Sequence, residues 1–341
     1  MITPETQVKD DWQGRDMTRA LWGWLVILAF LFIAFALALG TGPVSLSFFT
    51  LSPVDKVILF ELRLPRALSS FFVGGGLALS GAIFQGLFRN PLADSYILGI
   101  SSGASLGAAA ALVFGFTSPI AMLTGVSFFS FSGSLLALAL VFYFASQNGH
   151  ISVFRLLLSG LGIGLFFSSL VAILMIMAGE ELRALIFFFM GGFSSSTWET
   201  TLVVSIFVPL AVGASFYYSR ELNVMLLGEE MAQSSGVRVK FVQGIYAVLA
   251  AFLTSVSVSV AGLIGFVGLI VPHMIRLLVG ADHRTLLPMT FFAGGAFLTL
   301  CDTIAKVVLA PSEIPVGVVT SLCGVPFFLF LLKKEKWDYQ L

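Results

Sequence analysis

The residues that could do chemistry in this chain of 341 residues are few and dispersed. The three histidines, His150, His273 and His283, are far apart in the sequence and lack paired carboxylates. General acid–base catalysis needs such groups within reach of one another, so a membrane enzyme has little support. The two cysteines, Cys301 and Cys323, lie in apolar runs without metal-ligand spacing, and we interpret them as small core residues.

One polar segment in the second half of the chain has the pattern of a short, rigid helix. It reads LLGEEMAQSSGVRV from Leu226, with two acidic residues at the start and a glycine stop at Gly236. Negative charge is favourable at a helix N-terminus, and glycine adopts the left-handed conformation that ends a helix. The segment could dock on a partner; an ordinary solvated loop is the alternative that stays open.

The elements that position these residues must be membrane helices. Charged side chains make up 11% of the chain and apolar side chains 58%, whereas a soluble domain has about 25% charged residues. A soluble protein of this size needs a charged surface that this composition cannot supply. The apolar runs are long and do not alternate, which predicts an all-α integral membrane protein rather than a β-barrel. With zero net charge, no nucleic-acid partner is expected.

Charges, glycines and prolines mark the expected helix boundaries. We expect about ten spans, at about residues 21–39, 64–88, 96–114, 120–145, 153–178, 200–218, two within 247–279, 286–308 and 314–332. The pair within 247–279 should break around residues 262–268, and Pro272 should kink its helix. The amphipathic piece from Glu181 to Gly192 is too short to span a membrane. The turn RNPLAD begins at Arg89 and contains an Asn-Pro step.

Lys and Arg residues orient the bundle. With ten spans both termini lie on one side, and that side collects thirteen of the eighteen cations. The positive-inside rule therefore predicts cytoplasmic termini and a cytoplasmic 220–240 loop. We expect one membrane-spanning domain over residues 1–341, with residues 1–20 as a retained cytoplasmic tail rather than a signal peptide.

A weak internal similarity predicts an inverted repeat. SGAIFQ precedes RNPL, and AGLIGF precedes IVPH, in spans that should run in opposite directions. Chance similarity between two glycine-containing helices remains open. The recurrence of Gly99, Gly103 and Gly107 marks a face of small residues, either for packing within one subunit or for a dimer contact.

The energy source for any transport must lie outside the spans. None of them carries an Asp or Glu at mid-helix, which ion-coupled carriers usually need. The chain has no Gly-Lys dipeptide and therefore no phosphate-binding loop of the G-x-x-x-x-G-K-[ST] type. Either a separate subunit hydrolyses ATP, or transport is passive.

Six motifs together resemble a known family. They are RLPR from Arg63, SGAIFQGLFRNPLAD from Ser80, LGISSGASLGA from Leu98, LGEEMAQSSGV from Leu227, GLIGFVGLIVPHMIRLLVGADHR from Gly262 and EIPVGVVTSLCGVPFF from Glu313. In this order, over residues 60–332, they are similar to the permease subunits of ABC importers for iron-siderophores, haem and vitamin B12. The resemblance implies a ten-helix subunit that forms a homodimer in a prokaryotic cell membrane. It also implies two ATPase subunits on the cytoplasmic side and a substrate-binding protein outside.

The resemblance further implies roles for the residues that match these motifs. The residues that would dock the binding protein are Arg63, Arg66 and Lys306, although the family usually has Arg at the third position. The residues that would form a cytoplasmic gate are Asn90, Leu92, Val153 and Phe154. The residues that would couple to the ATPase are Gly228, Glu229, Glu230, Met231, Ala232 and Gly236.

Alternatives remain for these roles. The cations could instead snorkel to the membrane interface, and Leu92 could pack within its own subunit. The expected path is apolar and has no chelating cluster, so we expect a preformed chelate as cargo and no cofactor or metal site. A passive or ion-coupled carrier without an ATPase is the alternative function.

Overall fold

The structure is a computed structural model that describes residues 4–42, 44, 52–91, 93–116, 124–147, 150–151 and 153–333. Within these residues seven helices are long and apolar enough to cross a membrane, and three shorter apolar helices bring the number of spans to the expected ten. The predicted all-α membrane fold is thereby confirmed. One local difference is an antiparallel pair of two-residue strands, β1 (Ser146–Gln147) and β2 (His150–Ile151).

The helices lie close to the expected boundaries. The spans are α1 (Pro4–Gly40), α3 (Leu64–Phe88), α4 (Ile100–Phe114), α5 (Gly125–Ala145), α6 (Val153–Met177), α8 (Trp198–Tyr217), α11 (Val239–Ala261), α12 (Val267–Val279), α13 (His283–Val307) and α14 (Val316–Lys333). The short helices between them are α2 (Pro53–Val57), η1 (Ile58–Arg63), η2 (Ser95–Leu98), η3 (Gly179–Glu181), α7 (Leu182–Met190), α9 (Ser219–Leu226) and α10 (Glu229–Ser234).

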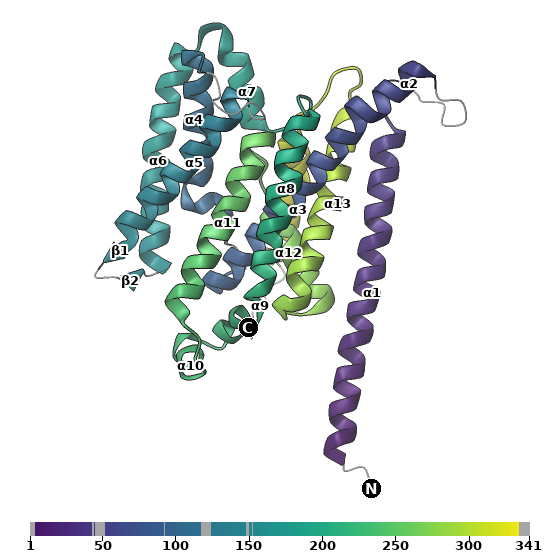
Figure 1. The fold of residues 1–341 in the computed structure, drawn as a ribbon, viewed down its shortest axis with the longest axis vertical. Helices are drawn as coiled ribbons and strands as arrows, with labels where there is room; N and C mark the ends of the chain where they lie inside the picture. Colours follow the sequence, from purple (N-terminus) through teal and green to yellow (C-terminus); the bar gives the residue numbers. More distant parts are fainter. Residues whose placement is uncertain are drawn as a thin grey trace.

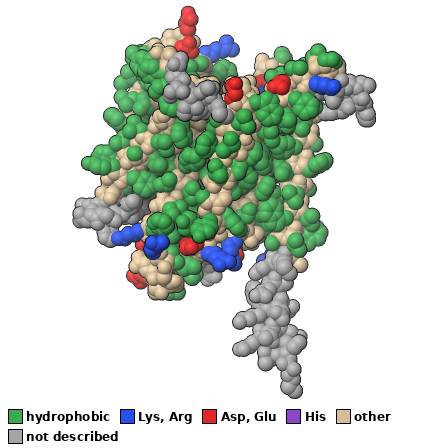
Figure 2. Space-filling view, viewed as in Figure 1, with side chains coloured by type: hydrophobic (Ala, Val, Ile, Leu, Met, Phe, Trp, Pro, Cys, Tyr) green, Lys and Arg blue, Asp and Glu red, His purple; other side chains and the backbone are tan. Residues whose placement is uncertain are grey.

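The two ends of the bundle carry different short helices. The start of α1, α9 and α10 lie at one end, and α2 and α7 lie at the other (Figure 1). Hydrophobic side chains cover the middle of the visible face, whereas charged groups gather near its two ends (Figure 2). Such a band is what a bundle surrounded by lipid requires. By the positive-inside rule the α9–α10 end is cytoplasmic, so the α2–α7 end is the outer one.

The core is built around α3, the most buried span, which packs against α8, α11, α12 and α13. Glycines allow the closest approaches. A Cβ on Gly81 would lie 1.9 Å from the carbonyl oxygen of Gly268 in α12, so only glycine fits there. On α4, a Cβ on Gly103 would lie 2.3 Å from the carbonyl oxygen of Gly133 in α5. The small-residue face of α4 therefore serves packing within the subunit.

The chain between α11 and α12 is irregular, as the glycines around residues 262–268 predicted. Irregular backbone at membrane depth must find its hydrogen-bond partners within the protein. Here Leu263 N donates to Phe188 O at 3.2 Å, and Gly192 N donates to Ala261 O at 2.8 Å. In the segment after α7, the Gly191 carbonyl also accepts a hydrogen bond of 3.0 Å from Val316 N. The end of α7, this break and the start of α14 are thus joined through backbone groups.

Candidate functional site

A cluster of charged side chains lies at the outer end, between α3 and α13. The guanidinium of Arg66 binds Asp302 through two hydrogen bonds of 2.8 Å and places Nη1 2.9 Å from Oε1 of Glu313. The side chains of Arg66 and Asp302 are 14% and 3% exposed, whereas that of Glu313 is 34% exposed. Two of the three charges are therefore shielded from water, and the third faces it.

Arg63 and Lys306 join the same cluster but bind backbone. Arg63 donates to the carbonyls of Leu39 and Val44, and Lys306 Nζ donates to the Ala38 carbonyl at 2.6 Å. The last carbonyls of a helix have no partner within it, and cations are favourable at that end. Both cations are buried and hold the outer end of α1. The structure thus brings the three predicted docking cations together, and their docking role stays a prediction.

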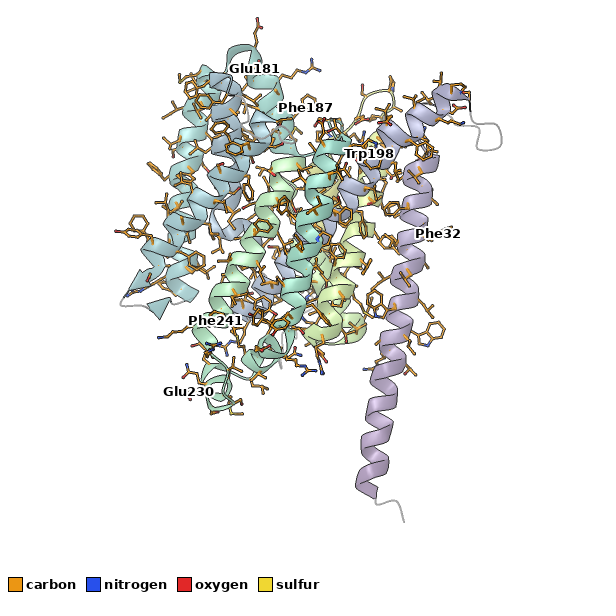
Figure 3. All side chains as sticks on the ribbon, in the orientation of Figure 1. Phe32, Glu181, Phe187, Trp198, Glu230 and Phe241 are labelled. Atoms are coloured by element: carbon orange, nitrogen blue, oxygen red, sulfur yellow. The ribbon has the colours of Figure 1, made fainter. Side chains whose placement is uncertain are left out.

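A cavity of about 780 Å³ opens beside the outer cluster. Arg66 and Glu313 line it, together with Arg183 from α7. Hydroxyl groups supply most of its other polar lining, from Thr124, Ser127, Ser194, Ser195, Ser259 and Ser312. The labelled side chains Glu181 and Phe187 lie at this same outer end (Figure 3).

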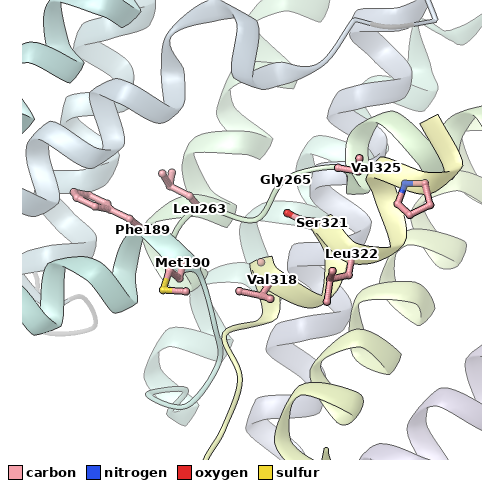
Figure 4. A pocket seen from close by; sticks show the side chains of 10 residues that line it. Phe189, Met190, Leu263, Gly265, Val318, Ser321, Leu322 and Val325 are labelled. Carbon is pink, nitrogen blue, oxygen red and sulfur yellow. The ribbon is translucent and has the colours of Figure 1, made fainter. Parts of the chain in front are cut away.

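Two further cavities have mainly apolar walls. One of about 670 Å³ lies between the end of α7, the break after α11 and the helix α14, as Figure 4 shows with Met190, Leu263 and Leu322. The other, of about 610 Å³, lies between α4 and α6. Its walls include Asn90 and Phe154, two residues of the predicted gate.

The turn that follows α3, which we call the RNP turn (Arg89–Pro91), is fixed by two backbone hydrogen bonds. Asn90 N donates to Gln85 O at 3.1 Å, and Arg89 N donates to Gly86 O at 3.3 Å, while Arg89 has a φ of 47°. This is the Schellman pattern of helix ends, here with arginine in the position that glycine usually takes.

Only part of the predicted gate can be placed. Asn90 is exposed in the RNP turn, and the Phe154 side chain is 74% exposed at the start of α6. Leu92 and the side chain of Val153 lie outside the described residues. The structure brings Asn90 and Phe154 to one cavity, and the gating role of the four residues stays a prediction.

The predicted short helix is confirmed as α10, and its cytoplasmic side stays an inference from the positive-inside rule. Gly228 precedes it with a φ of 111°, and Gly236 ends it with a φ of 86°. Val237 N donates to Ala232 O at 3.0 Å, which completes the C-terminal stop, and the Ala232 side chain is fully buried. Figure 3 shows Glu230 at the far end of the molecule on α10.

Of the remaining residues of α10, one contacts the bundle and two are exposed on the surface. Glu229 accepts a hydrogen bond of 2.9 Å from the Gln243 side chain in α11, which holds the helix against the bundle. Glu230 and Met231 are exposed. The helix therefore presents an acidic and an apolar side chain from a fixed base.

Sequence reasoning missed a polar link beside α10. Asn223 in α9 donates through Nδ2 to Asp282 at 2.7 Å and contacts His283. Hydrogen bonds from the Arg284 side chain hold the pKa of Asp282 at about 2, below its usual range, so that Asn223 meets a charged carboxylate at neutral pH. A lone asparagine has no spacing or periodicity that would reveal such a contact.

Comparisons with known proteins agree on one family. The model of the FecCD transport family matches residues 25–334. A cobalamin import system permease, BtuC of Halobacterium salinarum, is 42% identical over 281 residues, which cover 82% of this chain and 74% of the relative. A hemin transport system permease, HmuU of Yersinia pestis, is 40% identical over 333 residues, which cover 95% of this chain and 98% of the relative. A solved ABC transporter of the metal-chelate type, in an inward-facing conformation, superposes with a TM-score of 0.83 at 36% identity. The superposition covers 91% of this chain and 98% of that one.

Proposed function

The chain belongs to the FecCD transport family, and on this premise we propose that it is the permease subunit of an ATP-driven importer for a metal chelate. Its relatives are transport permeases, and the ten apolar helices among the described residues are those of a multi-pass membrane protein. Two relatives of nearly equal identity are named for different cargoes, cobalamin and hemin. The proposal therefore covers the class of bulky chelates, with siderophores, haem and cobalamin as its members.

The helix α10 is the observation that carries the proposal. Its glycine at each end and its buried Ala232 make it a rigid projection on the cytoplasmic side. The chain has no phosphate-binding loop of its own. A rigid, exposed helix can transmit force from a neighbouring protein, so two ATPase subunits are proposed to bind here, one on each copy of the chain. The contacts are proposed for Gly228, Glu229, Glu230, Met231, Ala232 and Gly236.

The translocation path is proposed to lie between two copies of the chain. The walls of the 670 Å³ and 610 Å³ cavities are apolar with a few hydroxyl groups, a lining suited to a preformed chelate. The exposed face of α6 carries large apolar side chains, including Phe154, Leu158 and Leu165. A second copy would cover this face, and the RNP turn with Phe154 would close its cytoplasmic mouth.

A substrate-binding protein is proposed to dock on the outer end. The charged cluster of Arg63, Arg66 and Lys306 supports this, since Glu313 is its exposed member and Arg66 lines the outer cavity beside it. Rim charges of this kind mainly set the association rate and the orientation of a partner.

Reconstitution in liposomes tests the proposal. The chain is purified with the ATPase and the binding protein of its own transporter, and accumulation of haem, cobalamin and a ferric siderophore is measured with and without ATP. We expect one cargo to accumulate only with ATP and the binding protein, and not with a hydrolysis-deficient ATPase. Equal uptake without ATP would instead support a passive carrier.

A further inference from the structure

Two segments of the chain, α9 and the start of α13, meet in a partly buried polar contact at the cytoplasmic end. Asn223 Oδ1 accepts the backbone N–H of His283 at 2.8 Å and lies 2.8 Å from His283 Nδ1. The other end of the same amide, Nδ2, donates to Asp282 Oδ1 at 2.7 Å. One side chain of α9 thus holds two successive residues at the start of α13. Asn223 is partly buried, and His283 is only 1% exposed.

The hydrogen bonds fix the state of the His283 ring. Because Asn223 Nδ2 is directed to Asp282, the atom that faces Nδ1 is an acceptor, so Nδ1 carries the proton. Nε2, the other ring nitrogen, is buried and has no hydrogen-bond partner. It is directed at Gly86 in the last turn of α3, where a Cβ would lie 2.8 Å away. The ring therefore fills a space that only glycine leaves open.

Gly86 belongs to the stop that forms the RNP turn. Its carbonyl accepts the N–H of Arg89, and the neighbouring Gln85 carbonyl accepts the N–H of Asn90. Leu222 of α9 also reaches this point, with its Cδ2 3.6 Å from the Cβ position of Gly86. The last turn of α3 is thus touched by α9 directly and through His283.

At its C-terminal end, α9 is followed directly by α10. Gly228 N donates to Met225 O at 3.1 Å, and Ala232 N donates to Gly228 O at 3.0 Å, so the two short helices are joined by hydrogen bonds across their junction. A displacement of α10 would move α9, and Asn223 would carry that movement to His283 and Gly86. Packed contacts of this kind transmit discrete shifts because protein interiors deform little.

We propose that Asn223 and His283 are positioning residues that connect the ATPase-coupling helix α10 to the RNP turn at the cytoplasmic mouth. The inference rests on the proposed function, since it assigns a route between two sites of that function. In this proposal neither residue contacts ATP or cargo. Both residues make the end of α3 move together with α9.

The test compares Asn223→Ala with Tyr246→Phe as a matched control. Tyr246 Oη donates to the Ser215 carbonyl at 2.7 Å, so the control loses one buried hydrogen bond between cytoplasmic helix segments away from Gly86, whereas Asn223→Ala loses the contacts to both Asp282 and His283. In liposomes containing the whole complex, we measure cargo uptake and ATP hydrolysis together. Asn223→Ala should lower the uptake per ATP by about fivefold, whereas Tyr246→Phe should leave this ratio unchanged.

A second readout does not depend on transport. In a background with Cys301→Ala and Cys323→Ala, Asn90→Cys reports the RNP turn through its rate of maleimide labelling. We expect nucleotide to change this rate in the parent complex and not in the Asn223→Ala variant. If Asn223→Ala does not accumulate, Asn223→Asp takes its place, because it keeps the size of the side chain and replaces the hydrogen bond to Asp282 with repulsion between two carboxylates.

The two proposals can fail separately. If the parent complex shows no ATP-driven uptake, the importer function is wrong, while the labelling rate still reports whether α10 and the RNP turn move together. An unchanged uptake per ATP and an unchanged labelling response in Asn223→Ala would overturn the link. A parallel fall of uptake and hydrolysis, with the same loss of thermal stability as Tyr246→Phe, would also overturn it.

Discussion

The Arg66 side chain divides its donor nitrogens between two carboxylates of very different exposure. Asp302 is 3% exposed and receives two of the hydrogen bonds, and Glu313 is 34% exposed and receives one. Removing one partner of a buried ion pair leaves an uncompensated charge, which costs about 3–5 kcal/mol. Removing the exposed partner costs about 0–1 kcal/mol.

This difference predicts the stability of two conservative variants. Asp302→Asn should lower the free energy of unfolding by about 3–5 kcal/mol, since it removes the buried counter-charge of Arg66 and leaves only the more exposed Glu313. Glu313→Gln should lower it by about 1 kcal/mol or less. Unfolding of the purified protein in detergent, followed by denaturant titration, measures both. Equal effects would mean that water reaches Asp302.

Docking of the binding protein can be examined without breaking the buried pair. Glu313→Arg leaves Arg66 and Asp302 in contact and exchanges an exposed acid for an exposed cation. If cations of this end receive acidic side chains of the partner, association should become faster and less of the partner should be needed to stimulate ATP hydrolysis. Slower association would indicate that the partner presents basic groups.

Among the elements, α10 depends on a conformation that side chains resist. Gly236 has a φ of 86°, and the open space around it means that backbone conformation, rather than crowding, selects glycine. Gly244, in the next helix, also has open space but ordinary helical geometry. The two glycines therefore share open space for a Cβ and differ in backbone conformation.

Alanine at these two positions should act in opposite directions. Gly236→Ala forces an L-residue into the left-handed region at about 1–2 kcal/mol, so the stop of α10 should loosen and stimulation of the ATPase should fall. Gly244→Ala should stabilise α11 by about 0.5–1 kcal/mol. ATPase stimulation and thermal unfolding are measured for both. Full stimulation of ATP hydrolysis by the Gly236→Ala variant would mean that α10 is not the coupling element.

At the scale of the whole molecule, the proposed importer has two copies of the chain that together seal the cytoplasmic mouth. An apolar constriction closes a pore by excluding water. Phe154 is exposed at the expected mouth, and Leu92 follows the RNP turn in sequence. We expect Leu92→Ser combined with Phe154→Ser to raise ion leakage from vesicles and to uncouple ATP hydrolysis from uptake.

A cross-link provides the control for this prediction. Leu92→Cys, with the two native cysteines replaced, should form a disulfide between two copies in the resting state. Leakage from vesicles is followed with a pH-sensitive dye. Tight vesicles together with no cross-link would place the seal elsewhere.

Apolar runs, together with the charges, glycines and prolines between them, predicted most of the helices of the bundle. Residues 64–88 were expected as a span and form α3, because RLPR and the Asn-Pro step bound a continuous apolar run. The helix α12 has only 13 residues, and its start was predictable because glycines precede it. The contacts between distant segments were not predictable. Asn223 and His283 are sixty positions apart, and neither has a periodic partner.

The hydrogen-bond partners of Arg63 and Lys306 could not be predicted from the sequence either. Their acceptors are carbonyls of α1 and the residues after it, and every residue has a carbonyl, so side-chain identity does not single them out. The motifs predicted that cations gather at this end. Only the packing of α1 beside α13 shows which backbone groups they satisfy.

The backbone joint between α7, the break after α11 and α14 has a consequence for biosynthesis. The chain leaves the ribosome N-terminus first, so Leu263 can pair with Phe188 as soon as α11 is in the membrane, whereas the Gly191 carbonyl must wait for Val316. An unpaired carbonyl at membrane depth is unfavourable. Insertion of the last helix therefore completes a joint begun more than a hundred residues earlier. A nascent chain that stops short of α14 should consequently be a substrate for membrane quality control, even with nine of its spans already inserted.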